Sequence, residues 1–447
     1  AHGAAGKAEM AVAAILGMLP FRGVQVAFVT GEREYVDPLE RLHTASGLFE
    51  YDATQPERMG RRPLAAIFGP LPSRTFTRPL AAWSPLKPPP HKAEKPAPFK
   101  IGGLELPMVT YEGRYEEGVS RLAELLAERF GSGDRRVFPV VAVGETGDLL
   151  GYGRDILAAL SDRGCPGYYF AHASGESYKR PDAYGKPGML KAVAEAKRAG
   201  YSVVVLAVGG GVNGNAMGMI AAMTGADFVE VPTTLMHYND ATTSAKKAFS
   251  LVVKGQILSK NILGTFYLPQ LVFCISEVFL TLNSCSVHAA VGEAAKTMSM
   301  LGDASSAAGQ RDFNNILGAS EFASDFTRIV GTVQGFERLI LFLKETLPLK
   351  EGAVAAGRAL RAAEEKKAPP DEIEAFEEQR RAIHSELRTF FRQGMPEEGR
   401  KEITHFLTVI NEEVIKAKAM FLAFSDPFEK YRALLFEYAH TLGHGVE

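Results

Sequence analysis

The hydrophobic pattern of residues 119–211 alternates between two periods. Residues 119–130 (VSRLAELLAERF) and 155–164 (DILAALSDRG) repeat apolar positions three and four residues apart, which predicts helices. Residues 137–144 (VFPVVAVG) and 202–211 (SVVVLAVGGG) are short apolar runs that end in glycine, which predicts buried strands. Strands that alternate with helices indicate an α/β domain built on a parallel sheet.

Two changes in this pattern divide the chain into three parts. Residues 69–107 are crowded with proline and predict a linker or an extended strap, because proline cannot donate to a hydrogen-bond ladder. After residue 271, long helical patterns prevail. We therefore expect an extension with a Pro-rich linker over 1–97, an α/β domain over 98–270 and a mainly α-helical domain over 271–447.

One stretch of the helical part, about residues 345–402, is dense in charged side chains. It is rich in Ala, Glu, Lys and Arg and is interrupted by Pro369 and Pro370. This pattern predicts an insertion of two solvated helices joined by a turn, a charged excursion rather than a site.

Composition and charge limit the classes of function. The 447 residues carry a formal net charge of -2, and 46% of them are hydrophobic. Nucleic acid and an anionic membrane are therefore not expected as partners, and no apolar run reaches the roughly 18 residues of a membrane-spanning helix. The three cysteines lack the spacing of a disulfide framework or a zinc knuckle. We expect a cytoplasmic protein that acts on a small molecule.

Glycines follow the strand predicted over residues 202–208 and precede an Ala- and Met-rich helical pattern. Gly209, Gly210 and Gly211 stand where backbone amides at a helix N-terminus approach a phosphate closely. A pyrophosphate fits such a loop. A glycine run before a helix is also often a plain turn.

Two pairs of residues have the spacing of one helix face. His440 and His444 are four residues apart in EYAHTLGHGVE, and Glu293 and Lys296 are three apart in VGEAAK. The histidines are suited to a metal or a substrate, and they are equally suited to an exposed helix surface. Taken alone, Glu293 and Lys296 are more typical of a surface ion pair.

Several motifs occur in an order that resembles one enzyme family. VPTTLMHYNDATTSAKKAFS, SKNILGTFYLPQLVF, VGEAAK and HTLGHGVE follow the glycine loop in the order seen in the dehydroquinate synthase-like sugar phosphate cyclases. The resemblance covers roughly residues 99–447. It implies an α/β N-terminal domain with a Rossmann-like parallel sheet that binds NAD, and a mainly α-helical C-terminal domain that binds a metal.

The resemblance also implies a role for individual residues. Cofactor-binding residues would be Glu176, Lys179, Gly209, Gly210, Gly211, Asn215, Thr233 and Thr234. Substrate-binding residues would be Asp240, Lys260, Asn261 and Lys416. Catalytic residues would be Lys246, Lys296, Glu437 and His444, and the metal ligands would be Glu293 and His440. The third metal ligand of the family is a histidine beyond HTLGHGVE, so we expect either a fragment or an incomplete metal site.

The family's chemistry explains these residue types. A divalent metal polarises a sugar hydroxyl, hydride passes to NAD, and the new ketone acidifies the neighbouring C–H so that phosphate leaves by elimination. The hydride then returns, so NAD is recycled, and an intramolecular aldol step closes the carbocycle. Lysines suit the phosphate and a histidine can relay a proton. Zinc suits a Glu and His ligand set, and cobalt is an alternative.

The details favour one branch of the family. Asn215, residues 244–246 with Ala248, and Glu437 resemble the 2-deoxy-scyllo-inosose synthases, which convert glucose 6-phosphate to 2-deoxy-scyllo-inosose. The alternatives within the family are 3-dehydroquinate synthase and the valiolone-type cyclases, which use sedoheptulose 7-phosphate. Outside it, a metal-dependent polyol dehydrogenase and a non-catalytic scaffold remain open. We also expect the protein to form a homodimer.

Overall fold

The computed structural model describes residues 29–30, 49–50, 94–96, 99–101, 104–131, 136–173, 175–185, 188–253, 256–299 and 326–422. The chain divides into two compact units. The first comprises residues 1–86, 298–319 and 437–447, and its described part is the parallel pair β1 (Val29–Thr30) and β2 (Phe49–Glu50) together with residues 298–299. The second comprises residues 87–297 and 320–436 and contains every other described residue.

A seven-stranded sheet forms the centre of the second unit, in the order β3-β6-β13-β10-β9-β7-β8. Neighbouring strands are parallel except β3 (Glu94–Pro96), which runs antiparallel to β6 at one edge. The parallel strands are β6 (Met108–Tyr111), β7 (Val137–Gly144), β8 (Tyr168–His172), β9 (Ser202–Gly209), β10 (Asp227–Pro232) and β13 (Leu271–Ile275). The expected α/β class with a parallel sheet is confirmed.

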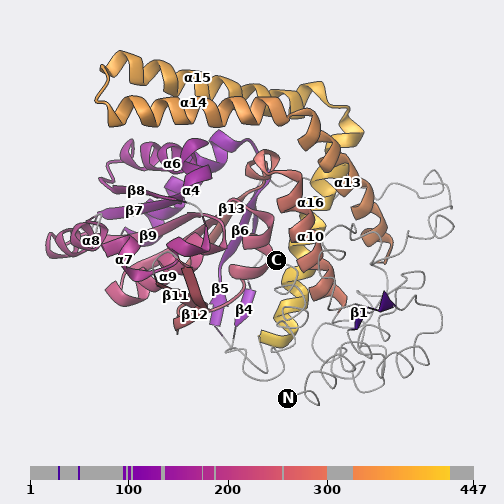
Figure 1. The fold of residues 1–447 in the computed structure, drawn as a ribbon, viewed down its shortest axis with the longest axis horizontal. Coiled ribbons are helices and arrows are strands. Elements are labelled where there is room, and N and C mark those ends of the chain that lie inside the picture. The colour runs from indigo at the N-terminus through magenta and orange to yellow at the C-terminus, as the bar shows by residue number, and fades with distance from the viewer. Residues whose placement is uncertain are drawn as a thin grey trace. The chain divides into compact units, whose positions relative to one another are not determined.

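Helices cover both faces of this sheet (Figure 1). The helices α4 (Tyr115–Phe130) and α6 (Tyr152–Ser161) lie on one face, and α8 (Met189–Arg198) and α9 (Gly211–Thr224) lie on the other. Since β7 and β9 are covered on both sides, nearly all of their side chains are buried. This burial explains why their sequences are continuous apolar runs.

Two further elements extend from the sheet. An antiparallel hairpin of β11 (Lys246–Val253) and β12 (Gln256–Phe266) packs against α9. The strand β13 begins at Leu271, so the sheet is completed by a segment that the sequence pattern assigned to the helical domain. Short strands β4 (Phe99–Ile101) and β5 (Leu104–Leu106) pair within the Pro-rich stretch.

Helices dominate the remainder, as expected. They are α10 (Ser284–Ser299), α13 (Phe326–Glu345), α14 (Leu347–Glu365), α15 (Pro370–Thr389) and α16 (Glu397–Leu422). The helices α14 and α15 form a helical hairpin along one side of the unit (Figure 1). Two helices joined by a turn were expected here, but a wholly solvated pair was not correct, because Arg380 of α15 is 1% exposed and Leu360 of α14 is 2% exposed.

Candidate functional site

The strand order creates a crevice at the carboxyl ends of β7 and β9. From β7 the chain continues outward to β8 at the edge of the sheet, whereas β9, β10 and β13 follow one another in the opposite direction. In parallel α/β sheets, ligands bind outside the carboxyl ends of the strands at such a reversal. A cavity of about 270 Å³ opens at this position.

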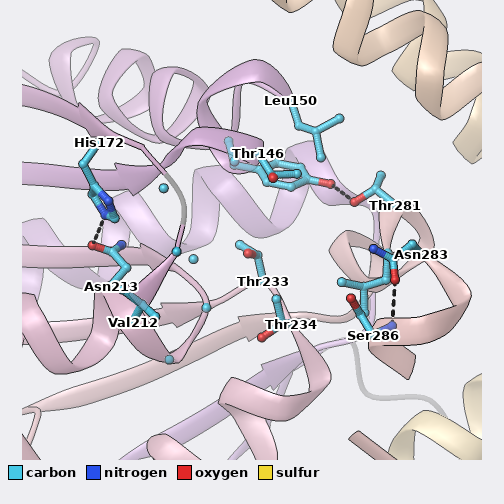
Figure 2. A pocket seen from close by; sticks show the side chains of 18 of the residues that line it. Thr146, Leu150, His172, Val212, Asn213, Thr233, Thr234, Thr281, Asn283 and Ser286 are labelled. Atoms are coloured by element: carbon cyan, nitrogen blue, oxygen red, sulfur yellow. Dashed lines mark hydrogen bonds between the residues drawn. The ribbon is translucent and has the colours of Figure 1, made fainter. Parts of the chain in front are cut away.

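Two walls enclose the cavity. The sheet wall consists of residues at or just after the ends of β7, β8, β9 and β10, including Gly144, His172, Gly209 and Thr233. The helical wall consists of Thr281, Leu282, Asn283, Ser286 and Lys350. Figure 2 shows His172 and Asn213 at one end of the cavity and Asn283 and Ser286 at the other. Glycines and hydroxyl side chains make up most of the sheet wall, and Thr281 and Ser286 add two hydroxyls from the helical wall.

The glycine loop forms the centre of the sheet wall. Gly209 has a φ of 156°, a value that favours glycine, and α9 begins two residues later at Gly211. The first turn of a helix leaves backbone N–H groups without intrahelical acceptors. All three glycines of the loop line the cavity, as do Thr233 and Thr234, which follow β10. Five of the predicted cofactor-binding residues therefore lie together.

Asn213 joins the strands on either side of the crevice. Its Nδ2 donates to the carbonyl oxygen of Ala142 in β7 at 2.9 Å and to that of Val208 in β9 at 3.0 Å. These two acceptors fix the amide, so Oδ1 faces Nε2 of His172 at 3.1 Å. The sequence interpretation named Asn215 instead, whose side chain donates to Gly211 O on its own helix and is not among the cavity-lining residues.

His172 lies between two hydrogen-bond acceptors. Its Nε2 faces Asn213 Oδ1, and its Nδ1 lies 2.9 Å from the carbonyl oxygen of Ala173. These two contacts hold the imidazole ring on the cavity wall. No motif in the sequence indicated this residue.

A polar cluster next to Gly175 joins residues that the motifs assigned separately. Lys179 Nζ lies 2.5 Å from Asn261 Oδ1 and 3.4 Å from Glu176 Oε1. Ser250 Oγ donates to Glu176 Oε1 at 3.0 Å and accepts from the backbone N–H of Asn261 at 3.3 Å. Burial lowers the pKa of Lys179, against the influence of Glu176. The structure thus brings together two predicted NAD contacts and one predicted substrate contact.

The strands β11 and β12 carry three lysines with different surroundings. Lys246 is half-buried and Lys260 is exposed. Lys247 is fully buried, and its Nζ lies 2.7 Å from Oε1 of the equally buried Glu230. Burial raises the pKa of Glu230, but the Lys247 and His237 charges and their hydrogen bonds outweigh it, so the net pKa is lowered. The sequence interpretation identified Lys246 and Lys260 but not this buried pair.

The predicted substrate residue Asp240 contacts a lysine of α16. Lys418 Nζ lies 2.5 Å from Asp240 Oδ1 and 3.1 Å from the Asp240 carbonyl oxygen. Lys418 is buried, whereas the Asp240 side chain is 46% exposed. The motif comparison pointed to Lys416, two residues earlier, whose side chain lies outside the described residues.

The predicted metal site lies only partly within the structure. Glu293 is half-buried on α10. Lys296 belongs to the same helix, but its side chain is outside the described residues, as are Glu437, His440 and His444 entirely. Within the described ranges, no three His, Cys, Asp or Glu side chains form a group that could hold a metal ion. No described helix is long and apolar enough to cross a membrane.

Comparison with known proteins shows that part of this chain is similar to one enzyme family. Residues 170–289 match the family model for the 3-dehydroquinate synthase N-terminal domain. The chain is 33% identical over 183 residues to 2-deoxy-scyllo-inosose synthase of Streptomyces paromomycinus, covering 40% of this chain and 43% of that protein. It is 40% identical over 94 residues to 3-dehydroquinate synthase of Caldanaerobacter subterraneus, covering 21% and 25%. The resemblance to the dehydroquinate synthase-like cyclase superfamily is confirmed.

The similarity covers part of each protein. The chain spans less than half the length of these two curated relatives. A solved structure of 2-deoxy-scyllo-inosose synthase, complexed with carbaglucose-6-phosphate, NAD+ and Co2+, superposes with a TM-score of 0.45 at 17% identity. That superposition covers 79% of this chain and 68% of the other.

Proposed function

We propose that this chain is the catalytic part of a sugar phosphate cyclase that uses NAD transiently and releases phosphate. The observation that carries the proposal is the position of the Glu176, Lys179 and Asn261 cluster directly after Gly175, which lines the glycine-loop cavity. The proposed dinucleotide site and this polar cluster therefore adjoin in one crevice.

The cavity fits part of a dinucleotide. Its volume of about 270 Å³ is slightly smaller than the about 300 Å³ at which ligand pockets typically begin, so it has room for part of a dinucleotide. No Asp or Glu is among the described residues that line it, and the first turn of α9 presents backbone amides beside Gly210 and Gly211. A diphosphate group matches these features in charge and in its need for hydrogen-bond donors.

The neighbouring lysines suit a sugar phosphate. Burial is the main cause that lowers the pKa of Lys179, and the positive charges of Lys260 and Lys247 lower it further. An anion beside these lysines would offset their mutual repulsion. We assign Lys260, Lys246 and Asn261 to the phosphate and hydroxyls of the substrate, together with Asp240 and Lys416.

Each group has a defined task in the proposed reaction. If NAD were bound, it would supply reversible hydride transfer, and the ketone present between the two transfers would acidify the adjacent C–H so that phosphate could leave. The sheet wall holds the cofactor, and the lysines stabilise the departing phosphate. His444 and Glu437 are proposed to move the proton, and Lys296 to act beside Glu293.

The metal is proposed on the motifs alone. Glu293 and His440 are the expected ligands, and a carboxylate with an imidazole is a donor set that suits zinc or cobalt. The ligand set stays a prediction, because only Glu293 lies within the described residues.

Glucose 6-phosphate is the proposed substrate. Asn215, Ala248 and Glu437 match the inosose branch, whereas Lys246, Lys260, Asn261 and Lys416 would serve any sugar phosphate of the family. Two seven-carbon compounds are the competing substrates: sedoheptulose 7-phosphate and 3-deoxy-arabino-heptulosonate 7-phosphate.

The test measures phosphate release by the natural full-length protein, loaded with metal and catalytic NAD, from each of the three compounds. Release from glucose 6-phosphate, with a carbocycle identified by NMR, is expected. Lys260→Ala should depress turnover of every substrate, while the exposed control Lys401→Ala should not. Preference for a seven-carbon compound would reject the inosose assignment. Accumulation of NADH without phosphate release would instead select a polyol dehydrogenase.

A further inference from the structure

Lys350 brings a positive charge to the cavity from the helical hairpin. It lies in the first turn of α14, a segment whose sequence predicted a charged excursion and no site. Among the described lining residues it is the one Lys or Arg, and none is acidic. Apart from His172, the walls otherwise consist of glycines, neutral polar side chains and apolar side chains.

The surroundings of Lys350 leave its charge available to a ligand. No described carboxylate lies within salt-bridge distance of its Nζ, although neighbouring Glu351 acts on it from farther away. Burial lowers the pKa of Lys350 more than Glu351 raises it. A half-buried ammonium that faces a cavity without acidic residues is stabilised when an anion enters.

The hairpin is attached to the short helix α5 (Glu145–Leu149), which forms part of the sheet wall. Arg361 of α14 donates to Asp148 of α5 at 2.5 Å. Arg154 of α6 forms a bidentate pair with Glu364 of α14, at 2.6 and 2.9 Å. Thr146 and Gly147 of α5 line the cavity. These contacts fix the position of α14, and with it Lys350, relative to the cavity wall.

A close backbone contact adds to this attachment. Gly357 of α14 lies so close to α5 that a Cβ there would be 2.2 Å from the carbonyl oxygen of Leu149. Arg380 of α15 donates to the carbonyl oxygen of the next residue, Leu150, at 2.6 Å. Leu150 itself lines the cavity. Both helices of the hairpin thus contact residues 149–150, at the cavity wall.

We propose that Lys350 binds a phosphate of the dinucleotide, so that the α14–α15 hairpin supplies a cationic contact opposite the glycine loop. The inference rests on the proposed NAD site and adds a binding residue that the family motifs do not include. Removal of Lys350 should weaken ligands that carry phosphate and leave a nucleoside without phosphate unaffected.

The experiment compares ligands with and without phosphate on the full chain. Calorimetry measures NAD and ADP-ribose, and NMR titration measures adenosine, for the wild type, Lys350→Gln and Lys350→Arg. A charge-assisted contact of this kind contributes about a ten- to hundredfold change in affinity. We expect that loss for NAD and ADP-ribose with Lys350→Gln, no change for adenosine, and partial recovery with Lys350→Arg. Lys366→Gln, exposed on the same hairpin, is the matched control.

Salt gives a second readout. The affinity of the wild type for NAD should fall more steeply with sodium chloride than that of Lys350→Gln, because the variant lacks one ionic contact. Unchanged NAD affinity in Lys350→Gln, or an equal loss for adenosine, would overturn the assignment while leaving the NAD site intact. A wild type that binds no NAD would overturn the proposed function and this inference together.

Discussion

The sheet wall and the helical wall of the cavity differ in how deeply the ion pairs that support them are buried. Behind the sheet wall, Glu230 and Lys247 form an ion pair with both side chains at 0% exposure. The hairpin that carries Lys350 is attached by ion pairs such as Arg361 with Asp148, in which the arginine is 33% exposed. A buried charge that loses its partner is much more costly than an exposed one. We therefore expect one substitution in the buried pair to reduce the free energy of unfolding strongly, whereas each substitution in the hairpin contacts should cost less.

The largest effect is expected at the buried pair. Lys247→Met leaves Glu230 buried without its cation, which should reduce the free energy of unfolding by about 3–5 kcal/mol. Chemical denaturation at pH 7 measures the loss. The double variant Glu230→Gln with Lys247→Met should recover much of it, because no uncompensated charge remains. A single variant as stable as the wild type would show that the pair does not stabilise the sheet wall.

His384 of α15 is buried, with its ring against that of Tyr152 of α6. It should make the hairpin less stable in acid. Burial, with smaller contributions from Arg388 and Arg380, lowers the pKa of His384 to about 3. The unfolded chain binds this proton below pH ~6.5, so stability is lost as the pH falls from there toward 3. We expect His384→Leu to remove about 2 kcal/mol of the difference between pH 7 and pH 5, measured by urea unfolding. Parallel pH profiles of the two proteins would contradict this.

Two glycines of α14 allow a matched test of the hairpin contact. Gly357→Ala would place its Cβ 2.2 Å from the Leu149 carbonyl oxygen, whereas at Gly352 the nearest atom, Cδ1 of Ile383, is 3.7 Å away. Overpacking should destabilise Gly357→Ala by about 1–2 kcal/mol. Gly352→Ala should be neutral or gain up to about 1 kcal/mol from helix propensity. Thermal unfolding compares them, and equal shifts would refute the close contact.

The smallest effect is expected at the partly exposed pairs. Burial raises the pKa of Asp148, but hydrogen bonds from Tyr169 and Arg361 outweigh it, so the net pKa is lowered. Stability from Asp148 is therefore present above its unfolded pKa and is lost as the pH falls through the folded pKa. Arg361→Ala should cost about 1 kcal/mol at pH 7 and progressively less as the pH falls through the folded pKa of Asp148, as measured by urea unfolding. The exposed control Arg338→Ala, which breaks the contact with Glu402, should stay within about 0.5 kcal/mol.

The same contrast explains what the sequence could predict. The strands, the glycine loop and its threonines follow from local pattern and motif, since each lies within one short segment. The hairpin contacts do not, because the Arg361 contact spans 213 residues and the Arg380 contact spans 230. A charged helical pattern predicts solvent exposure when the residues that its charges contact are that far away in the sequence. The pattern also could not separate Lys247 from Lys246, since a lysine gives no local sign of burial.

The strand order also bears on how the chain reaches this state. The adjacent strands β8, β7, β9 and β10 come from one continuous stretch, residues 137–232, whereas β6 pairs with β13, where Val272 lies opposite Met108. Closing the longer loop costs more chain entropy and slows pairing. We expect the crevice strands to assemble first and β6 to dock last. Amide protons of β6 should then gain protection after those of β9 in pulse-labelled refolding, so the crevice would exist before the sheet is complete.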